Sequence, residues 1–277
     1  MPVPSITLND QTTIPQLGLG VYQVPPAQTA AVVTTALEIG YRHIDTAQMY
    51  GNEDGVGQAI ASSGIARDEL YVTTKLDNGN HRPDDVRRTF DESLARLGLD
   101  HVDLFLIHWP LPTSYDGDYV STWQAMTELR ADGRARSVGV SNFHGVHLDR
   151  IVGETGEAPA VNQIEAHPYL TNDDQRAASH ARGITVEAWA PIARGKVNDE
   201  EVIQRIAKRH GKTPAQVTLR WHVERHDVVF PKSTREERMR ENFEIFDFQL
   251  SPDEVAEITA LDRGEAGRIG PNPETFG

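Results

Sequence analysis

The chain has 277 residues, of which 38% are hydrophobic, and its formal net charge is −14. This length suits one large core, so we expect a single domain over residues 1–277, whereas the acidic balance argues against a nucleic-acid partner. No apolar stretch reaches the roughly 18 residues of a membrane helix, the N-terminus resembles no secretory signal, and there is no cysteine. We expect a cytoplasmic protein with no membrane partner, and the lack of heptads favours a monomer.

Short apolar, β-branched runs alternate with longer amphipathic segments along the chain. Residues 6–8 and 13–15 flank the turn Asn9-Asp10-Gln11 and predict a hairpin that caps the bottom of a barrel. The runs that follow predict eight strands, at residues 17–20, 42–45, 71–75, 102–108, 136–142, 160–165, 184–189 and 228–232. Helices are predicted between them, among others at residues 26–39, 82–97, 119–131, 200–210 and 236–246.

Helix-start signals support this alternation. Pro83 and Pro214 suit a first helical turn, and Ser251-Pro252-Asp253-Glu254 resembles the capping box of an extra helix over residues 251–262. A Gly/Pro-rich tail, residues 264–277, follows. Eight strands that each precede a helix predict an α/β fold, a (β/α)8 TIM barrel, and an open doubly wound sheet is the alternative topology.

Polar and aromatic residues stand where the predicted strands end. In a parallel barrel these ends form the mouth where active sites lie, and a purely structural barrel needs no such ring. The sequence therefore predicts one polar-lined pocket, built from Asp45, Lys75, His108, Trp109, Ser141, Asn142, Gln163, Trp189, Lys232 and Ser233.

Four residues of this region have the chemistry of a proton donor. Tyrosine has an ordinary pKa of roughly 10 and is a poor acid at neutral pH. An ammonium such as Lys75 lowers that pKa, a carboxylate such as Asp45 holds the ammonium, and His108 can orient a carbonyl oxygen. A loop tyrosine or a buried Lys–Asp pair is more often structural when it stands alone, but the combination with Tyr50 favours function.

Three segments then resemble the aldo-keto reductase family, and the resemblance covers nearly the whole chain. It is similar above all to the prokaryotic reductases grouped with 2,5-diketo-D-gluconate reductase, as in residues 158–165. The resemblance implies NADPH-dependent reduction of aldehydes, ketones or dicarbonyls, keto-sugars included, with Asp45, Tyr50, Lys75 and His108 as catalytic residues. The three segments are residues 40–47 (continuing through Tyr50, Glu53 and Gly57), residues 136–143, and Pro231-Lys232-Ser233 (continuing through Arg238, Glu241 and Asn242).

The resemblance also implies a cofactor site, and the residues themselves lead us to expect no metal. Ser141, Asn142 and Gln163 would bind the nicotinamide carboxamide, and Trp189 would stack on the ring. A local basic cluster on an acidic chain suits the 2′-phosphate of NADPH. Lys232, Ser233 and Arg238 would form this cluster, Glu241 and Asn242 would face the adenine, and Ala190, Ile192, Phe230, Thr234 and Arg268 are further candidate contacts.

The expected substrate pocket departs from the family pattern. Where relatives carry Leu-Trp-Asn after the lysine, this chain has Leu76-Asp77-Asn78, and Gln48 stands where an apolar residue is common. Both changes predict a more polar pocket and hydrophilic carbonyl substrates. The expected substrate-binding residues are Tyr22, Gln48, His108, Trp109 and Phe276.

Several alternatives compete with this interpretation. Gly18-Leu19-Gly20 begins like a dinucleotide-binding glycine loop but lacks the third glycine, so we interpret it as a strand end that lets backbone approach a ligand. His222 and His226 have metal-ligand spacing without a third ligand, which favours an exposed helix end. Glu165 and Glu187 could form the carboxylate pair of a barrel glycosidase. A relative that binds the cofactor without turnover is the other alternative.

Overall fold

Eight parallel strands form the central sheet of the computed structural model, which describes residues 2–277. Neighbours in the chain are neighbours in the sheet, so the order is that of a barrel. The strands are β3 (Leu19–Gly20), β4 (His43–Asp45), β5 (Tyr71–Leu76), β6 (Val102–Ile107), β7 (Ala135–Ser141), β8 (Val161–Glu165), β9 (Thr185–Trp189) and β10 (Val228–Val229).

The first and last strands of this sheet meet. Leu17 bridges to Val229 and Gly20 to Lys232, both in parallel, and the Gly20 N–H donates to the Phe230 carbonyl at 3.1 Å. These contacts close the sheet into the predicted (β/α)8 TIM barrel, and the open doubly wound alternative is therefore wrong.

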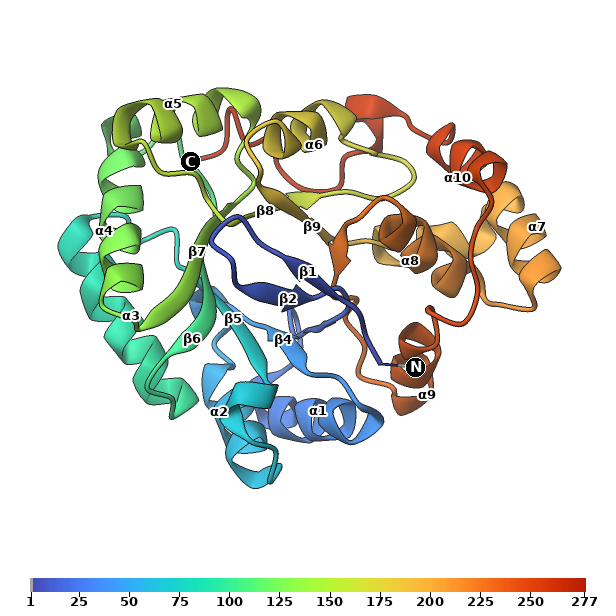
Figure 1. The fold of residues 1–277 in the computed structure, drawn as a ribbon, viewed down its shortest axis with the longest axis horizontal. Helices are drawn as coiled ribbons and strands as arrows, with labels where there is room; N and C mark the ends of the chain where they lie inside the picture. Colours follow the sequence, from blue (N-terminus) through green and yellow to red (C-terminus); the bar gives the residue numbers. More distant parts are fainter. Residues whose placement is uncertain (1) are drawn as a thin grey trace.

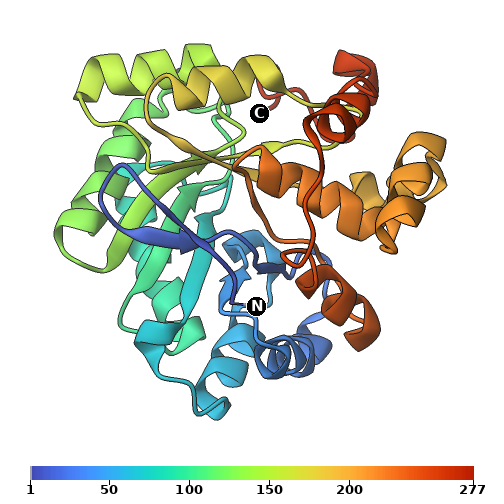
Figure 2. The same cartoon turned by 45° about the vertical axis from the view of Figure 1, so that its right-hand side comes forward.

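The helices surround the barrel on its outside (Figure 1, Figure 2). Two of them, α7 (Glu201–His210) and α8 (Pro214–Glu224), lie between β9 and β10 in the chain. Helix α9 (Glu236–Phe243) ends three residues before its predicted end at residue 246. In the described part of the chain, no helix is both long enough and apolar enough to cross a membrane. The helices are α1 (Pro26–Ile39), α2 (Glu53–Ser62), α3 (Pro83–Leu97), α4 (Val120–Ala131), α5 (Gly145–Thr155), α6 (Asp173–His180), α7 (Glu201–His210), α8 (Pro214–Glu224), α9 (Glu236–Phe243) and α10 (Pro252–Thr259).

The expected hairpin is present as β1 (Ser5–Thr7) and β2 (Thr13–Pro15), one residue earlier in its first strand than predicted. Leu8 and Ile14 are buried and pack in one cluster with Tyr71 and Val161, which begin β5 and β8. The hairpin therefore closes the N-terminal end of the barrel, across which it lies in Figure 1. The opposite, C-terminal end of the barrel carries the candidate site.

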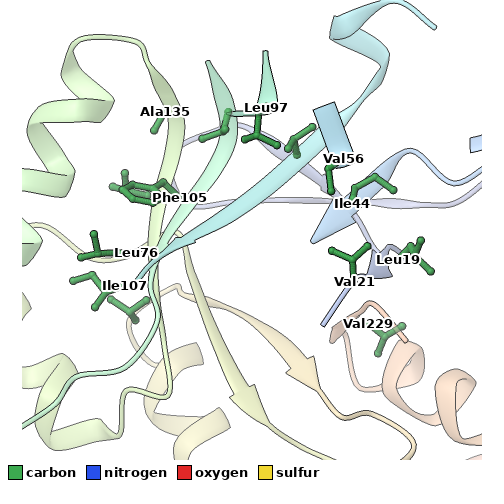
Figure 3. Packing of buried hydrophobic residues seen from close by; sticks show 14 of the residues in the cluster. Leu19, Val21, Ile44, Val56, Leu76, Leu97, Phe105, Ile107, Ala135 and Val229 are labelled. Carbon is green, nitrogen blue, oxygen red and sulfur yellow. The ribbon is translucent and has the colours of Figure 1, made fainter. Parts of the chain in front are cut away.

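Alternate residues of the strands pack in different clusters, as the period of a strand requires. On β6, Phe105 and Ile107 belong to the large cluster that includes the helices, whereas Leu104 and Leu106 pack with the hairpin residues. Figure 3 shows strand residues such as Phe105 in the same core as Leu97 of α3.

The glycines at residues 18 and 20 allow close packing at the seam of the barrel, the junction where its first and last strands meet. A Cβ atom at Gly20 would lie 2.7 Å from the Phe230 carbonyl oxygen, and one at Gly18 would lie 2.8 Å from the His43 ring. The interpretation of this segment as a place where backbone approaches a ligand is therefore incomplete, because the close approach is first of all to neighbouring strands.

We expect Gly20→Ala to lower the free energy of unfolding by about 1–3 kcal/mol, since backbone at the seam must move to admit the methyl group. Urea unfolding followed by circular dichroism measures the effect. Gly153→Ala is the matched control: Gly153 lies in α5, and nothing lies within 4 Å of the position that an added methyl group would take, so this change should be neutral or stabilising. Equal stabilities for the two variants would contradict the seam interpretation.

Candidate active site

A cavity of about 710 Å³ opens at the C-terminal ends of the barrel strands. Asp45 ends β4, Ser141 ends β7 and Trp189 ends β9, so the parallel strands deliver these side chains to one mouth. The volume lies in the usual range of small-ligand and cofactor sites. The sequence-predicted residues that line the cavity are Tyr22, Asp45, Tyr50, His108, Trp109, Ser141, Asn142, Gln163, Trp189, Ala190, Ile192, Phe230, Lys232, Ser233, Arg238, Glu241 and Asn242.

The four expected catalytic residues lie together at this mouth. The Lys75 ammonium donates to Asp45 Oδ1 at 2.6 Å, to the Thr46 carbonyl at 2.9 Å and to the Tyr50 hydroxyl at 3.4 Å. Tyr50 ends a short 3-10 helix, Gln48–Tyr50, which packs against β5, and the centroid of its ring lies 5.8 Å from that of His108. One ammonium thus connects a buried carboxylate with a phenol that faces the cavity.

Burial and charge act in opposite directions on this group. Burial, the largest single effect, lowers the pKa of Lys75, but Asp45, Tyr50 and Glu187 together outweigh it, and the pKa of Lys75 is raised. Burial raises the pKa of Tyr50 to about 12 against the opposing effect of Lys75. The expectation of a phenol with a lowered pKa is therefore wrong for the net value: the ammonium acts in the expected direction, but desolvation is larger.

His108 is a neutral imidazole at physiological pH. Burial lowers its pKa well below the ordinary value, and the charge of Lys75 lowers it further. The Asn142 side-chain amide donates to the His108 carbonyl oxygen at 2.9 Å and fixes the backbone at this point. A neutral imidazole offers one N–H donor, which suits the orientation of a substrate oxygen.

The residues expected at the nicotinamide carboxamide form one hydrogen-bonded group. Ser141 Oγ donates to the Gln163 carbonyl oxygen at 2.8 Å, and Asn142 Nδ2 donates to Ser141 Oγ at 3.1 Å. The Trp189 indole N–H donates to Asn142 Oδ1 at 2.7 Å. The stacking ring and the amide beside it are therefore held in place by each other.

Two cations of the same cavity lie at the β10–α9 connection. Lys232 and Arg238 are exposed, and neither makes an ion pair at 4.0 Å or less with any residue in the range 2–277. Arg238 is in the first turns of α9, where helix N–H groups also favour anions. The cavity thus combines an aromatic ring for stacking, amide groups for hydrogen bonds and two unpaired cations for phosphate. This combination fits a phosphorylated dinucleotide.

Two expected cofactor contacts lie outside the cavity. Arg268 is held by Glu265, with 2.6 Å between Arg268 Nη2 and Glu265 Oε1, and is 8% exposed in its side chain. Thr234 is exposed and does not line the cavity. The tail does contribute, but through Gly270 and Pro271, which lie two and three residues beyond the predicted arginine.

Two expected substrate contacts, Gln48 and Phe276, do not line this cavity either. Gln48 Nε2 donates to the Thr89 carbonyl and to Ser93 Oγ, both at 3.1 Å, so its side chain binds α3 instead of the cavity. Phe276 packs against Trp109 with 4.6 Å between ring centroids, but it lines a separate hollow together with Tyr115. The polar pocket inferred from Gln48 and Asp77 loses its support, since neither residue lines the cavity.

A segment after β9 lines the cavity without having been predicted. Arg194, Gly195 and Asn198 belong to the 3-10 segment Ala193–Asp199, in which Arg194 and Gly195 have positive φ values of 55° and 90°. The signal in the sequence is a basic residue and a glycine shortly after the stacking tryptophan, a combination suited to close approach of backbone and charge to a phosphate.

The residues of the rejected alternatives have structural surroundings. Glu165 accepts from the Ile269 and Gly270 N–H groups and anchors the tail, and Glu187 is fully buried; neither lines the cavity as a glycosidase pair would. His222 is also fully buried, with Nδ1 2.8 Å from Asp227 Oδ2, so its interpretation as an exposed helix end is wrong.

Comparison with known proteins agrees with this geometry. The family model described as Aldo/keto reductase family matches residues 15–263. A methylglyoxal reductase DkgA of Yersinia pestis is 48% identical over 277 residues, which cover 99% of this chain and 98% of the relative. A mutant of Gox0644, solved in complex with NADPH, superposes with a TM-score of 0.95 at 42% identity over 100% of both chains. A putative 2,5-diketo-D-gluconic acid reductase B has a TM-score of 0.92 at 38% identity, covering 99% of this chain and 96% of that one. The chain belongs to the aldo/keto reductase family.

Proposed function

We propose that this protein reduces the carbonyl group of a small aldehyde, ketone or dicarbonyl to an alcohol with NADPH, and that Tyr50 donates the proton. The observation that carries the proposal is the contact of the Lys75 ammonium with both Asp45 and the Tyr50 hydroxyl at the cavity mouth. Family membership supports the reaction class, and a solved relative in complex with NADPH supports the cofactor.

NADPH supplies a hydride when it is bound. Ser141, Asn142 and Gln163 are proposed to hold its carboxamide, and Trp189, fixed through Asn142, to present a flat face to its ring. These residues line the same cavity as Tyr50 and His108, so the groups that would hold the nicotinamide and the proposed proton donor share one site.

The carbonyl oxygen is proposed to lie between the Tyr50 hydroxyl and the His108 imidazole. His108 donates a hydrogen bond and orients the oxygen. Tyr50 gives its proton to the oxygen as negative charge develops there, and Lys75 stabilises the phenolate that remains. A pKa of about 12 keeps Tyr50 protonated throughout the physiological range, as a proton donor requires.

A spectrophotometric assay tests the function directly. The protein is mixed with NADPH and methylglyoxal, the substrate in the name of one relative, and absorbance is followed at the nicotinamide band. A steady fall in absorbance is expected. A glycosidase leaves the band unchanged, and a non-catalytic relative binds NADPH without consuming it. We propose small hydrophilic carbonyl substrates because one relative is named for methylglyoxal and another for a keto-sugar acid, 2,5-diketo-D-gluconic acid.

We expect Arg238→Ala to weaken NADPH binding by about 10- to 100-fold, because it removes a charge-assisted contact to the 2′-phosphate. The dissociation constant of NADH, which lacks that phosphate, should change by less than about threefold. Fluorescence titration with each cofactor measures both values.

Arg235→Ala is the matched control for this prediction, since Arg235 is a nearby exposed cation that does not line the cavity. It should affect both cofactors little. Equal losses for NADPH and NADH in Arg238→Ala would remove the assignment of Arg238 to the 2′-phosphate.

We also propose that the chain acts as one domain and as a monomer in the cytoplasm. Sedimentation equilibrium tests the monomer, because a dimer would double the molar mass of 30.7 kDa. Cell fractionation tests the location.

A further inference from the structure

A second carboxyl group lies beneath the four proposed catalytic residues. Glu187, on β9, is fully buried, and its Oε2 accepts a hydrogen bond from Gln163 Nε2 at 2.9 Å. The same nitrogen of Gln163 donates to Asp45 Oδ2, also at 2.9 Å. Asp45 is in turn the partner of Lys75, so Glu187 is linked to the ammonium through one amide group.

This arrangement fixes the orientation of the Gln163 amide. Both neighbours are carboxyl oxygens that accept, so the amide nitrogen must face them, and its two hydrogens are used once each. The Gln163 carbonyl oxygen of the side chain is thereby left for the cavity, where the proposed carboxamide would donate to it. Without Glu187, one of the two constraints on this orientation is gone.

No positively charged side chain near Glu187 is available to form an ion pair with it. Lys75 is engaged by Asp45, and burial lowers the pKa of His43, whose Nε2 lies 4.0 Å from Glu187 Oε1, to about 3. Tyr71, the other titratable group near Glu187, is neutral, because burial raises its pKa well above the ordinary value. Two ionised carboxylates with one ammonium would leave a buried negative charge unpaired, so one must keep a proton.

The proton belongs on Glu187. Asp45 has the direct ion pair at 2.6 Å, whereas Glu187 Oε1 has no hydrogen-bond partner among the described residues. Burial, and after it the charge of Asp45, raises the pKa of Glu187 to about 8. The group is therefore neutral at pH 7 and becomes charged as the pH rises through about 8.

We propose that Glu187 is a positioning residue for the carbonyl reduction: as a neutral acid it holds the Gln163 amide against Asp45, and its ionisation slows proton donation by Tyr50. The inference rests on the proposed function. A negative charge at Glu187 opposes formation of the Tyr50 phenolate and draws on the same ammonium that must stabilise it. Glu187 touches neither the cavity nor the proposed reacting atoms, and it acts through Gln163 and Asp45.

The pH profile of kcat for NADPH and methylglyoxal tests the inference with three proteins. In the wild type, kcat should fall as the pH rises through about 8. Glu187→Gln keeps the shape and neutrality of the protonated acid, so it should match the wild type within about threefold at pH 6.5 and exceed it by about tenfold at pH 9. Glu165→Gln is the control: this buried carboxyl group has a lowered pKa, so its variant should keep the alkaline fall.

Superimposable profiles for the wild type and Glu187→Gln would overturn the inference while leaving the proposed function intact. No NADPH oxidation by the wild type at any pH would instead overturn the proposed function. Infrared spectroscopy gives an independent readout: the carbonyl stretch of a protonated carboxylic acid should be present at pH 7 in the wild type and Glu165→Gln, and absent in Glu187→Gln. If all three proteins showed the same band, the protonated group would not be Glu187. That result would overturn the inference independently of any activity measurement.

Discussion

Tyr50→Phe is expected to lower kcat for carbonyl reduction by about 10³-fold, or about 4 kcal/mol in activation free energy. The change removes the hydroxyl that would supply the proton and nothing else of the ring. The ring keeps its contacts with Tyr22 and His108, whose ring centroids lie 5.1 Å and 5.8 Å away. The dissociation constant of NADPH should therefore stay within about twofold, so the loss falls on kcat.

Stopped-flow measurement of NADPH oxidation in a single turnover checks this prediction, because it isolates the chemical step from release of the oxidised cofactor. Tyr115→Phe serves as the control: its hydroxyl donates to the Asn78 carbonyl at 3.0 Å, and it does not line the cavity. It should react at nearly the wild-type rate. If Tyr50→Phe were equally fast, Tyr50 would not be the acid.

The barrel could be predicted from the sequence because each strand carries its signal locally. β5 and β6 are continuous buried runs, as strands covered on both faces must be, and their predicted bounds differ from the observed ones by a residue. Closure of the sheet between Leu17 and Val229 followed from the count of strands. The shortened end of α9 did not, since nothing local in residues 244–246 stops a helix.

The candidate site was predictable where strands end and unpredictable where loops fold. Asp45, Ser141 and Trp189 are aimed by the strands that precede them. Gln48 lies in a loop, and its direction is decided by acceptors on α3 that are 41 and 45 residues away in the chain. The tail places Gly270 and not Arg268 at the cavity because Glu165 binds the N–H groups of residues 269 and 270. Such long-range contacts leave no periodic pattern in the sequence.

The net pKa of Tyr50 could not be predicted from the sequence either. The presence of Lys75 indicates the sign of one contribution, but the desolvation that outweighs it depends on how closely the barrel mouth packs around the ring. The role of Lys75 is therefore to make a buried phenol less unfavourable to ionise, and not to bring its pKa near neutrality.

Removal of that ammonium should have the second large effect. We expect Lys75→Met to lower kcat by about 10³-fold, because the phenolate would form beside no positive charge, while the affinity for NADPH stays within a few fold. Methionine is also unbranched and fills much of the space of the fully buried lysine. The variant is compared with the wild type by steady-state kinetics and cofactor titration, and a near-normal kcat would refute the assignment.

The protonation state of Asp45 in the Lys75→Met variant gives a second, more specific test. Burial already raises the pKa of Asp45, so without its ammonium the carboxylate should take up a proton and become neutral. Asp45→Asn should then cost activity in the wild-type background, where it loosens Lys75, but change kcat by less than about threefold when Lys75→Met is already present. If the fold-losses in kcat of the two single variants multiplied in the double variant, Asp45 would act on the reaction independently of the ammonium that contacts it at 2.6 Å.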